Sequence, residues 1–494
     1  MLFNSIQYLA FFVVTALVYY VLPKRARNLW LLAASYFFYG CYNIAYTALL
    51  AGVTLTTWGC GLMIQRHVDR SGAENKAPLK KWVALAVVIN MLLLCFFKYT
   101  NFLMENILRL TGGAKEGSTF LNIIMPIGIS FYIFQAVGYV IDVYRQKIRA
   151  EKNIINYGLF VSFFPQLASG PIGRATGLLP QIKAPRAFDV ERVRRGLVEF
   201  CWGSFLKLMI ADRAALLVNT VYGAHTKYSG LVLLVAALCY SFQIYCDFAS
   251  YSYMAVGCGR VLGFDMIQNF NTPYFAVSIT DFWRRWHISL SSWFRDYLYI
   301  PLGGSRKGKV RKHLNTMIVF LVSGLWHGAN WTYVVWGGLN GLFQVIGNSL
   351  KPLRMKICKA LHCDPESFGN RVLRILFTFV LVTITWVFFR AASIGQAFDV
   401  LKGIVTNLQP WTLFNGTLLK LGLSGADMTV MIVSLLVVLG VSLAKASGKD
   451  LIGELLKQGV LFRWTVYLLL IFSILIFGMY GTGYDAASFI YFQF

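Results

Sequence analysis

The sequence predicts an all-α protein that crosses a membrane many times, and three observations support this fold class. Of its 494 residues, 57% are hydrophobic and only 14% are charged, whereas soluble domains carry about 25% charged residues. Long apolar runs recur along the chain, as expected for spanning helices that satisfy their own backbone hydrogen bonds. Basic residues gather in the short loops between these runs. Disorder, a coiled coil and a collagen-like rod are excluded because none has this hydrophobic and aromatic content.

Most apolar segments approach the ~20 residues that a helix needs to cross a bilayer. The clear segments lie at about 7–22, 30–64 (two spans), 82–97, 230–257, 372–389, 428–444 and 464–480. Less apolar candidates lie at about 121–143, 196–221 and 314–350. Together they predict roughly eleven or twelve crossings in a single membrane domain, residues 1–494. The first segment has no basic stretch before it, so we expect no cleavable signal peptide.

The net charge of +25 has to be compared with the membrane topology before it is assigned to a binding partner. Lys24, Arg25 and Arg27 directly follow the first apolar segment, and short basic loops stay in the cytoplasm, so we expect the N-terminus outside. Alternating the spans from there puts the other basic clusters inside, at about 66–81, 145–152, 174–195, 306–312, 351–374 and 445–463. Topology in a cell membrane thus accounts for most of the charge, and nucleic-acid binding is not expected.

The stretch 265–313 interrupts the hydropathy pattern with aromatic and basic residues at helical spacing. We expect a helix here that lies in the membrane interface or enters the protein from the inner side. His287 would sit in the middle of this helix, one turn after Trp283, so that the two side chains share a face. The aromatic and basic residues of this helix also include Arg284, Arg285, Trp286, Trp293, Phe294, Arg295 and Tyr297.

A second unusual stretch, residues 319–341, places a histidine inside an apolar segment. His327 is flanked there by Trp326 and by two glycines. A histidine at membrane depth is costly and by default faces the bundle interior or a wet cavity, and glycines allow a backbone or a thin substrate to approach closely. His287 and His327 are therefore the candidate functional residues; the alternative is that each only hydrogen-bonds across helices.

Other polar residues in the apolar segments leave their roles open. Asp247 could orient a histidine or make another polar contact, and Lys207, Asp212 and Arg213 could pair with one another on one predicted helix. No metal site is expected, because the nine cysteines form no CxxC pair and the six histidines have no metal-type spacing. The absence of Walker, HExxH and GxSxG motifs disfavours an ATP-driven pump and a hydrolase.

At the two histidines the sequence resembles the membrane-bound O-acyltransferases, and most of all the branch that O-acetylates alginate. Two long motifs carry the resemblance, DFWRRWH at 281–287, which continues to Gly304, and SGLWHGA at 323–329. Shorter matches lie at about 125–145, 163–172, 269–274, 385–390 and 489–494. The resemblance therefore runs along the whole chain, with a core at about 120–390 and C-terminal helices at 391–494.

The resemblance implies re-entrant or interfacial helices around a central tunnel, and acyl transfer from a thioester to a hydroxyl. His327 corresponds to the catalytic histidine of the family and His287 to its companion. No bound cofactor is implied; acetyl coenzyme A or an acyl-carrier thioester would be the donor substrate on the cytoplasmic side. The acceptor would be an extracytoplasmic polysaccharide, served by a separate serine-dependent acetyltransferase outside the membrane.

Seven further residues are expected to bind substrate or donor. The run from Arg306 to Lys312 follows the His287 segment and would attract an anionic donor, unless it only obeys the positive-inside rule. Trp283 is expected to help His287 orient the thioester or stabilise the developing oxyanion. The complete set is Trp283, Arg284, Arg285, Trp326, Asp247, Arg306 and Lys307.

The sequence departs from the alginate branch at two places, and rival functions remain. Ser250 and Tyr253 replace the glycine and second aspartate of the usual DFxGYSD, and Asn340 stands where many relatives have a third histidine. Rival activities are D-alanyl transfer to teichoic acid and O-acetylation of peptidoglycan. A polysaccharide transporter without chemistry would predict inverted repeats, of which we find none, and a non-catalytic scaffold would leave His327 unexplained.

Overall fold

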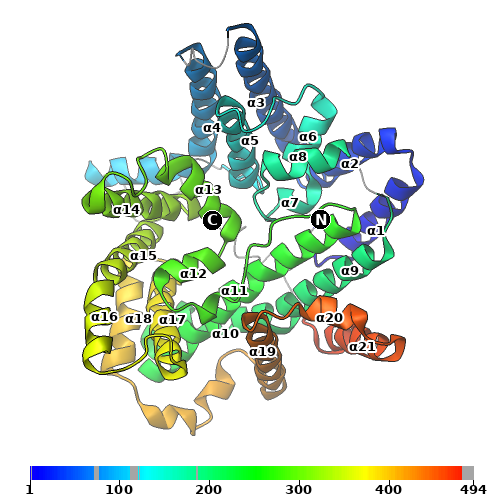
Figure 1. Ribbon diagram of the computed structural model, residues 1–494. Coiled ribbons are helices and arrows are strands. Elements are labelled where there is room, and N and C mark those ends of the chain that lie inside the picture. Colours follow the sequence, from blue (N-terminus) through cyan, green and yellow to red (C-terminus); the bar gives the residue numbers. More distant parts are fainter. Residues whose placement is uncertain (2, 72–76, 112–120, 122, 185–186, 481–494) are drawn as a thin grey trace. The chain divides into compact units, whose positions relative to one another are not determined.

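The computed structural model describes residues 1, 3–71, 77–111, 121, 123–184 and 187–480 (Figure 1). Parts of two basic clusters, at 72–76 and 185–186, and the family match at 489–494 lie outside these residues. The described part is helical and contains no strand, which confirms the all-α class. It forms two compact units: the first is Met1–Phe200 with Tyr251–Gln268, and the second is Cys201–Ser250 with Asn269–Phe494.

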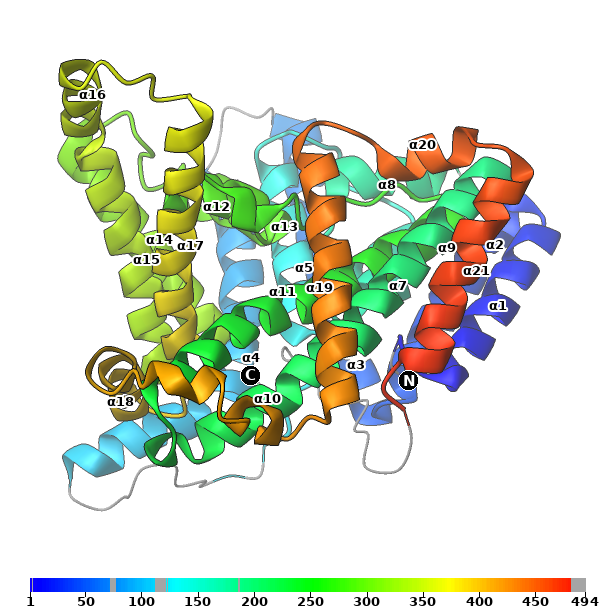
Figure 2. The same cartoon turned by 90° about the horizontal axis from the view of Figure 1, so that it is seen from below.

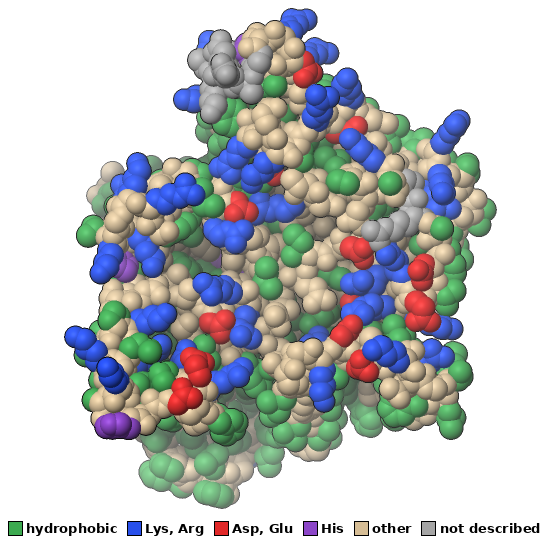
Figure 3. Space-filling model, in the orientation of Figure 1, with side chains coloured by type: hydrophobic (Ala, Val, Ile, Leu, Met, Phe, Trp, Pro, Cys, Tyr) green, Lys and Arg blue, Asp and Glu red, His purple; other side chains and the backbone are tan. Residues whose placement is uncertain are grey.

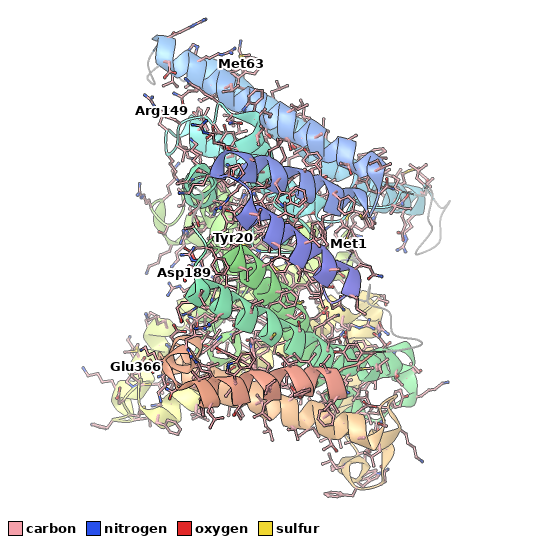
Figure 4. All side chains as sticks on the ribbon, turned by 90° about the vertical axis from the view of Figure 1, so that its right-hand side faces the viewer. Met1, Tyr20, Met63, Arg149, Asp189 and Glu366 are labelled. Atoms are coloured by element: carbon pink, nitrogen blue, oxygen red, sulfur yellow. The ribbon has the colours of Figure 1, made fainter. Side chains whose placement is uncertain are left out.

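The first unit is a cluster of helices in which α3 packs against α2, α4, α5 and α6. Pro23 separates the first two helices, and Ser5 caps the start of α1 by accepting from the amide of Tyr8. Figure 4 shows Tyr20, near the end of α1, on the same side of this unit as Asp189, with Met1 at the opposite end of α1. The helices are α1 (Ile6–Val21), α2 (Lys24–Gly40), α3 (Ile44–Ser71), α4 (Ala77–Leu110), α5 (Ile129–Tyr144), α6 (Ile154–Ser162), α7 (Phe164–Leu167), α8 (Ala175–Lys183) and α9 (Val190–Phe205), whose last residues belong to the second unit.

The second unit carries both candidate histidines and is built around the hairpin of α14 and α15. Helix α17 packs on α15, and Figure 2 shows these three helices side by side, with α16 at one end and α18 at the other. The α-helices are α10 (Asp212–Gly223), α11 (Gly230–Val261, ending in the first unit), α12 (Ile279–Arg285), α13 (Ile288–Phe294), α14 (Gly308–His327), α15 (Trp331–Ser349), α16 (Lys351–Ala360), α17 (Phe368–Arg390), α18 (Ile394–Thr406), α19 (Gly425–Ala446), α20 (Leu451–Lys457) and α21 (Val460–Phe477). Two π-helices, η1 (Leu206–Ala211) and η4 (Arg295–Tyr299), and four 3-10 turns, η2 (His225–Lys227), η3 (Pro273–Phe275), η5 (Pro410–Leu413) and η6 (Thr417–Lys420), complete it.

Six helices of the described chain are long and apolar enough to cross a membrane, which confirms a multi-pass protein. They are α3, α4 from Leu79 onward, α11, α17, α19 and α21. Shorter apolar helices cover Ile6–Val21, Ile129–Tyr144 and Ile154–Leu167. The predicted eleven or twelve crossings exceed these six and stay a prediction.

One predicted span starts later than expected. The segment expected at 121–143 becomes helical only at Ile129, after Gly128 in the left-handed conformation at φ 73°. A Cβ on Gly128 would lie 2.0 Å from the carbonyl oxygen of Leu167, so only glycine fits this close approach.

The α14–α15 hairpin depends on glycines at the crossing of its two helices. A Cβ on Gly324 would lie 2.2 Å from the carbonyl oxygen of Tyr333, and one on Gly337 would lie 2.3 Å from that of Phe320. Such small residues let two helix backbones approach closely. The hairpin in turn fixes His327, the last residue of α14.

Replacing Gly324 with alanine is therefore expected to destabilise the protein by about 1–3 kcal/mol, because overpacking a closed interface forces the backbones apart. Gly338→Ala on α15 is the matched control, since its Cβ would meet nothing closer than Leu321 Cδ2 at 3.7 Å. Thermal unfolding of both purified variants in one detergent measures the difference. Equal unfolding temperatures for the two variants would contradict the close-approach explanation.

Candidate active site

His287 lies at a break between two short helices, so the expectation of one helix with His287 in its middle is wrong. Helix α12 ends at Arg285, Trp286 is extended, and His287 adopts a left-handed conformation at φ 44° and ψ 53° before α13 begins. A non-glycine residue in this conformation is uncommon and costs free energy unless its surroundings hold it there.

Asn269 provides that support from a preceding loop. Its carbonyl oxygen accepts from the amide of Ile288 at 3.0 Å, and its Oδ1 accepts from the amide of Ser289 at 3.1 Å. The amide of Asn271 in the same loop donates to the carbonyl of Arg285 at 3.0 Å. Amide groups that a continuous helix would use internally are thus satisfied by this loop, which stabilises the break at His287.

The ring of His287 is fully buried among aromatic side chains. It packs edge-on against Phe248 of α11, with ring centroids 4.6 Å apart, and lies 6.0 Å from Trp326. This segment is outside the six spanning helices, and burial lowers the pKa of the His287 imidazole from its ordinary 6.5 to about 3. The ring is therefore neutral near pH 7, with one nitrogen as a donor and the other as an acceptor.

His327 ends α14 within a shell of aromatic rings and is itself buried. Trp326 and Trp336 each lie 5.0 Å from its ring centroid, and Phe389 of α17 lies 5.4 Å away. The His287 ring is at a centroid distance of 6.4 Å. The structure therefore brings together the two histidines that the sequence singled out, one at the break before α13 and the other at the end of α14.

Two buried imidazoles at this separation can take different catalytic roles in acyl transfer. One can accept a proton from a nucleophile, while the other donates a hydrogen bond to negative charge that develops on a carbonyl oxygen. The surrounding rings lower the local dielectric constant, which strengthens both interactions.

The predicted substrate-binding residues on α12 have different surroundings from those expected. Trp283 donates from Nε1 to Asn340 Oδ1 at 3.2 Å and packs on Trp336 at 5.6 Å. Because of the break after Arg285, Trp283 and His287 do not share a helix face. Arg285 pairs with Asp281 at 3.0 Å and donates to Thr272, whereas Arg284 is exposed.

Three further predicted residues divide between the histidine cluster and the surface. Trp326 contacts both histidines, as described above. Arg306 and Lys307 are exposed in the turn before α14. Figure 3 shows Lys and Arg side chains spread over the face of the second unit on which α12, α13 and α16 lie in Figure 1.

Asp247 is part of a buried charge cluster formed with the π-helix η1. Lys207 Nζ lies 2.7 Å from Asp247 Oδ1 and 2.8 Å from Asp212 Oδ1, and all three side chains are at most 5% exposed. The predicted pairing of Lys207 with Asp212 is confirmed. Arg213 instead contacts Asp427 and the carbonyl oxygen of Leu208.

Lys207→Met is expected to lower the free energy of unfolding by about 3–5 kcal/mol, because it leaves two buried carboxylates without their shared cation. Converting Asp212 and Asp247 to asparagine in the same protein should restore much of that loss. Lys227→Met changes an exposed lysine of the same unit and serves as the control. Denaturant titration measures the free energy of unfolding of each variant. A Lys207→Met protein as stable as Lys227→Met would contradict the role of Lys207 as the shared cation.

Several aromatic neighbours of the histidines were not predicted as site residues. Phe389 packs on His327, and Trp386 packs on Phe389 and Trp336. Both lie within the stretch 385–390 that matched the family, at a spacing that puts them on one helix face. Phe248 directly follows Asp247, but α11 is apolar on all sides, so no pattern marks the face that meets His287.

Known proteins are similar to this chain over most of its length. The profile of the membrane-bound O-acyltransferase family matches residues 31–393. A probable alginate O-acetylase of Pseudomonas putida is 37% identical over 438 residues, which cover 88% of this chain and 86% of that protein. The peptidoglycan O-acetyltransferase of Helicobacter pylori is 35% identical over 437 residues, or 82% of this chain and 80% of that one.

A more distant relative is the teichoic acid D-alanyltransferase of Streptococcus thermophilus. It is 28% identical over 281 residues, which cover 53% of this chain and 68% of that protein. These matches confirm the resemblance that the two histidine motifs suggested. The chain belongs to the membrane-bound O-acyltransferase family.

Proposed function

We propose that this acyltransferase moves an acetyl group from a cytoplasmic thioester donor towards hydroxyl groups of an extracytoplasmic polysaccharide, with His327 as the base. The observation that carries the proposal is the buried pair of imidazoles, His287 and His327, at a centroid distance of 6.4 Å. The relatives named as alginate and peptidoglycan O-acetylating enzymes cover at least 80% of this chain. The D-alanyltransferase relative covers only 53%, so acetyl transfer is favoured over D-alanyl transfer.

The proposed reaction conserves protons. His327 removes a proton from the acceptor hydroxyl as the oxygen attacks the thioester carbonyl carbon. The C–O bond forms, the C–S bond breaks, and the imidazolium of His327 returns its proton to the departing thiolate. A positioned base of this kind contributes typically ~10²–10⁴-fold to the rate.

His287 is proposed to act as the companion that stabilises the developing oxyanion. Its ring is neutral, because burial lowers its pKa to about 3, and a neutral imidazole keeps one N–H to donate. The left-handed backbone held by Asn269 fixes the direction of this ring. A fixed donor needs no reorganisation as negative charge develops, which is the basis of this form of catalysis.

The donor is proposed to be acetyl coenzyme A or an acyl-carrier thioester, attracted by Arg306 and Lys307. Helix α14 separates these residues from His327 by its 20 residues, or roughly 30 Å at 1.5 Å per residue. The basic turn therefore acts on the anionic end of the donor, and only a long, flexible arm can carry the thioester to the histidines. Both proposed donors have such an arm.

Reversing the charge at both Arg306 and Lys307 to glutamate is expected to raise the donor KM several-fold and to leave kcat unchanged. Added salt should shrink the difference, because screening weakens attraction between exposed charges. Initial rates at low and high salt measure the effect, with Lys356→Glu/Lys359→Glu on α16 as the matched control. An unchanged KM with intact topology would mean that the basic turn only orients the protein in the membrane.

The acceptor and the partner are proposed from the alginate-type relatives. Mass analysis of cell-surface glycans, with and without this protein, identifies the polymer that loses acetyl groups. Loss from peptidoglycan alone would assign the rival acceptor, and loss of D-alanine alone would refute acetyl transfer. A separate extracytoplasmic serine-dependent enzyme is proposed to complete the delivery. Donor turnover by the purified chain distinguishes an enzyme from a transporter.

A further inference from the structure

The second unit contains a cavity of about 490 Å³ between α15, α16 and α17. Its walls are mainly apolar, formed by side chains such as Phe343, Leu353, Ile357 and Phe377. Val277 and Ser278, which directly precede α12, and Ile279, its first residue, form one edge. None of the aromatic residues around His287 and His327 lines this cavity, so it is distinct from the candidate active site.

Basic groups line the same cavity. Lys351, Arg354 and Arg374 are among its lining residues, whereas no acidic side chain is, in a part of the chain (277–381) that the structure describes throughout. Arg374 uses Nη1 to donate to Glu366 and to the carbonyl of Pro365, while its Nε is buried and has no acceptor among the described residues. This donor and the two neighbouring cations suit an anionic group.

Helix α16 has the composition of a helix that lies at a membrane surface. It has no acidic side chain, its basic side chains Lys351 and Arg354 line the cavity, and Leu353 and Ile357 are about half exposed. Figure 2 shows α16 at the end of α15 and α17 that lies opposite α18. A basic, apolar helix of this kind binds the headgroup region of anionic lipid.

We propose that this cavity binds one anionic phospholipid, with its phosphate at Lys351, Arg354 and Arg374 and an acyl chain between α15, α16 and α17. The apolar walls match a hydrocarbon chain and the basic groups match a phosphate, so one ligand that carries both satisfies the whole site. The lipid is a bound component and not an acyl donor. Through Val277–Ile279 it contacts the beginning of α12, the helix that leads to His287.

Native mass spectrometry of the purified full-length protein tests this site with phosphatidylglycerol and phosphatidylcholine as probes. Gly347→Leu fills the cavity from α15, where a new Cβ would meet nothing within 4 Å. Arg354→Gln/Arg374→Gln removes two of the three cations at the proposed phosphate site. Lys356→Gln/Lys359→Gln removes two charges from the same helix without touching the lining and is the matched control.

We expect the wild-type protein and the control to retain one phosphatidylglycerol under conditions that remove phosphatidylcholine. Both site variants should lower that occupancy by roughly tenfold, with unfolding temperatures near that of the wild type for Gly347→Leu. Equal retention by Gly347→Leu, or equal retention of the two lipids by the wild type, would overturn the proposal. Displacement by the same concentration of soluble glycerol phosphate would also overturn it, because a free anion would then suffice.

Discussion

Replacing His327 with glutamine is expected to reduce acyl transfer by about 10²–10⁴-fold while the protein still inserts and accumulates normally. Glutamine can fill much of the same space and form hydrogen bonds, but it cannot accept and return a proton at neutral pH. The loss therefore estimates the contribution of general base catalysis. Acetyl transfer from a labelled donor, normalised to the amount of purified protein, is the measurement.

His313→Ala is the control for this variant, since His313 lies on the same helix but near its other end and is partly exposed. It should keep transfer within about twofold of the wild type, as expected for a surface substitution away from special contacts. If the His327 variant retained full activity, the assignment of the base would be wrong.

His287→Asn is expected to lower kcat by about 10²–10³-fold, the usual effect of losing one oxyanion donor, with little change in donor KM. Asparagine is chosen because it tolerates the left-handed conformation that His287 adopts at φ 44°. His287→Ala would combine loss of the ring with backbone strain. Steady-state kinetics of the asparagine variant separate the chemical role from the structural one, and an unchanged kcat would refute the companion role.

The pH dependence of stability offers a second test of the His287 environment. Its pKa is lowered to about 3 in the folded protein, against about 6.5 in an unfolded chain. The contribution of the neutral His287 ring to the free energy of unfolding is thus fully present above pH 6.5, and it is lost as the pH falls toward 3. Between pH 7 and pH 5 the wild type should lose about 2 kcal/mol more stability than His287→Asn. The same pH dependence in both proteins would mean that His287 is not desolvated.

The apolar pattern was sufficient to predict the helices but not the break at His287. Residues 281–297 have helical spacing, and nothing local to them indicates that Trp286 is extended. The break depends on hydrogen bonds that Asn269 accepts from the amides of Ile288 and Ser289, and Asn269 lies 18 residues before His287. Tertiary contacts of this kind override local periodicity.

The candidate site was predictable to the extent that its residues are unusual in an apolar chain. His287 and His327 stood out for that reason, whereas Phe248, Trp336 and Phe389 resemble ordinary core residues until the fold brings them to the two rings. Arg285 was expected to bind the donor, yet its ion pair with Asp281 at i,i+4 spacing is a local feature that the sequence already contained.

The most direct test of the central claim is a single-turnover experiment with purified protein in vesicles, a radiolabelled acetyl thioester and an oligosaccharide acceptor. The wild-type protein should release the thiol and deliver the label to acceptor hydroxyls in the presence of the extracytoplasmic partner. The His327→Gln protein should bind the donor and leave the thioester intact. Release of the thiol at the same rate by both proteins would contradict the account.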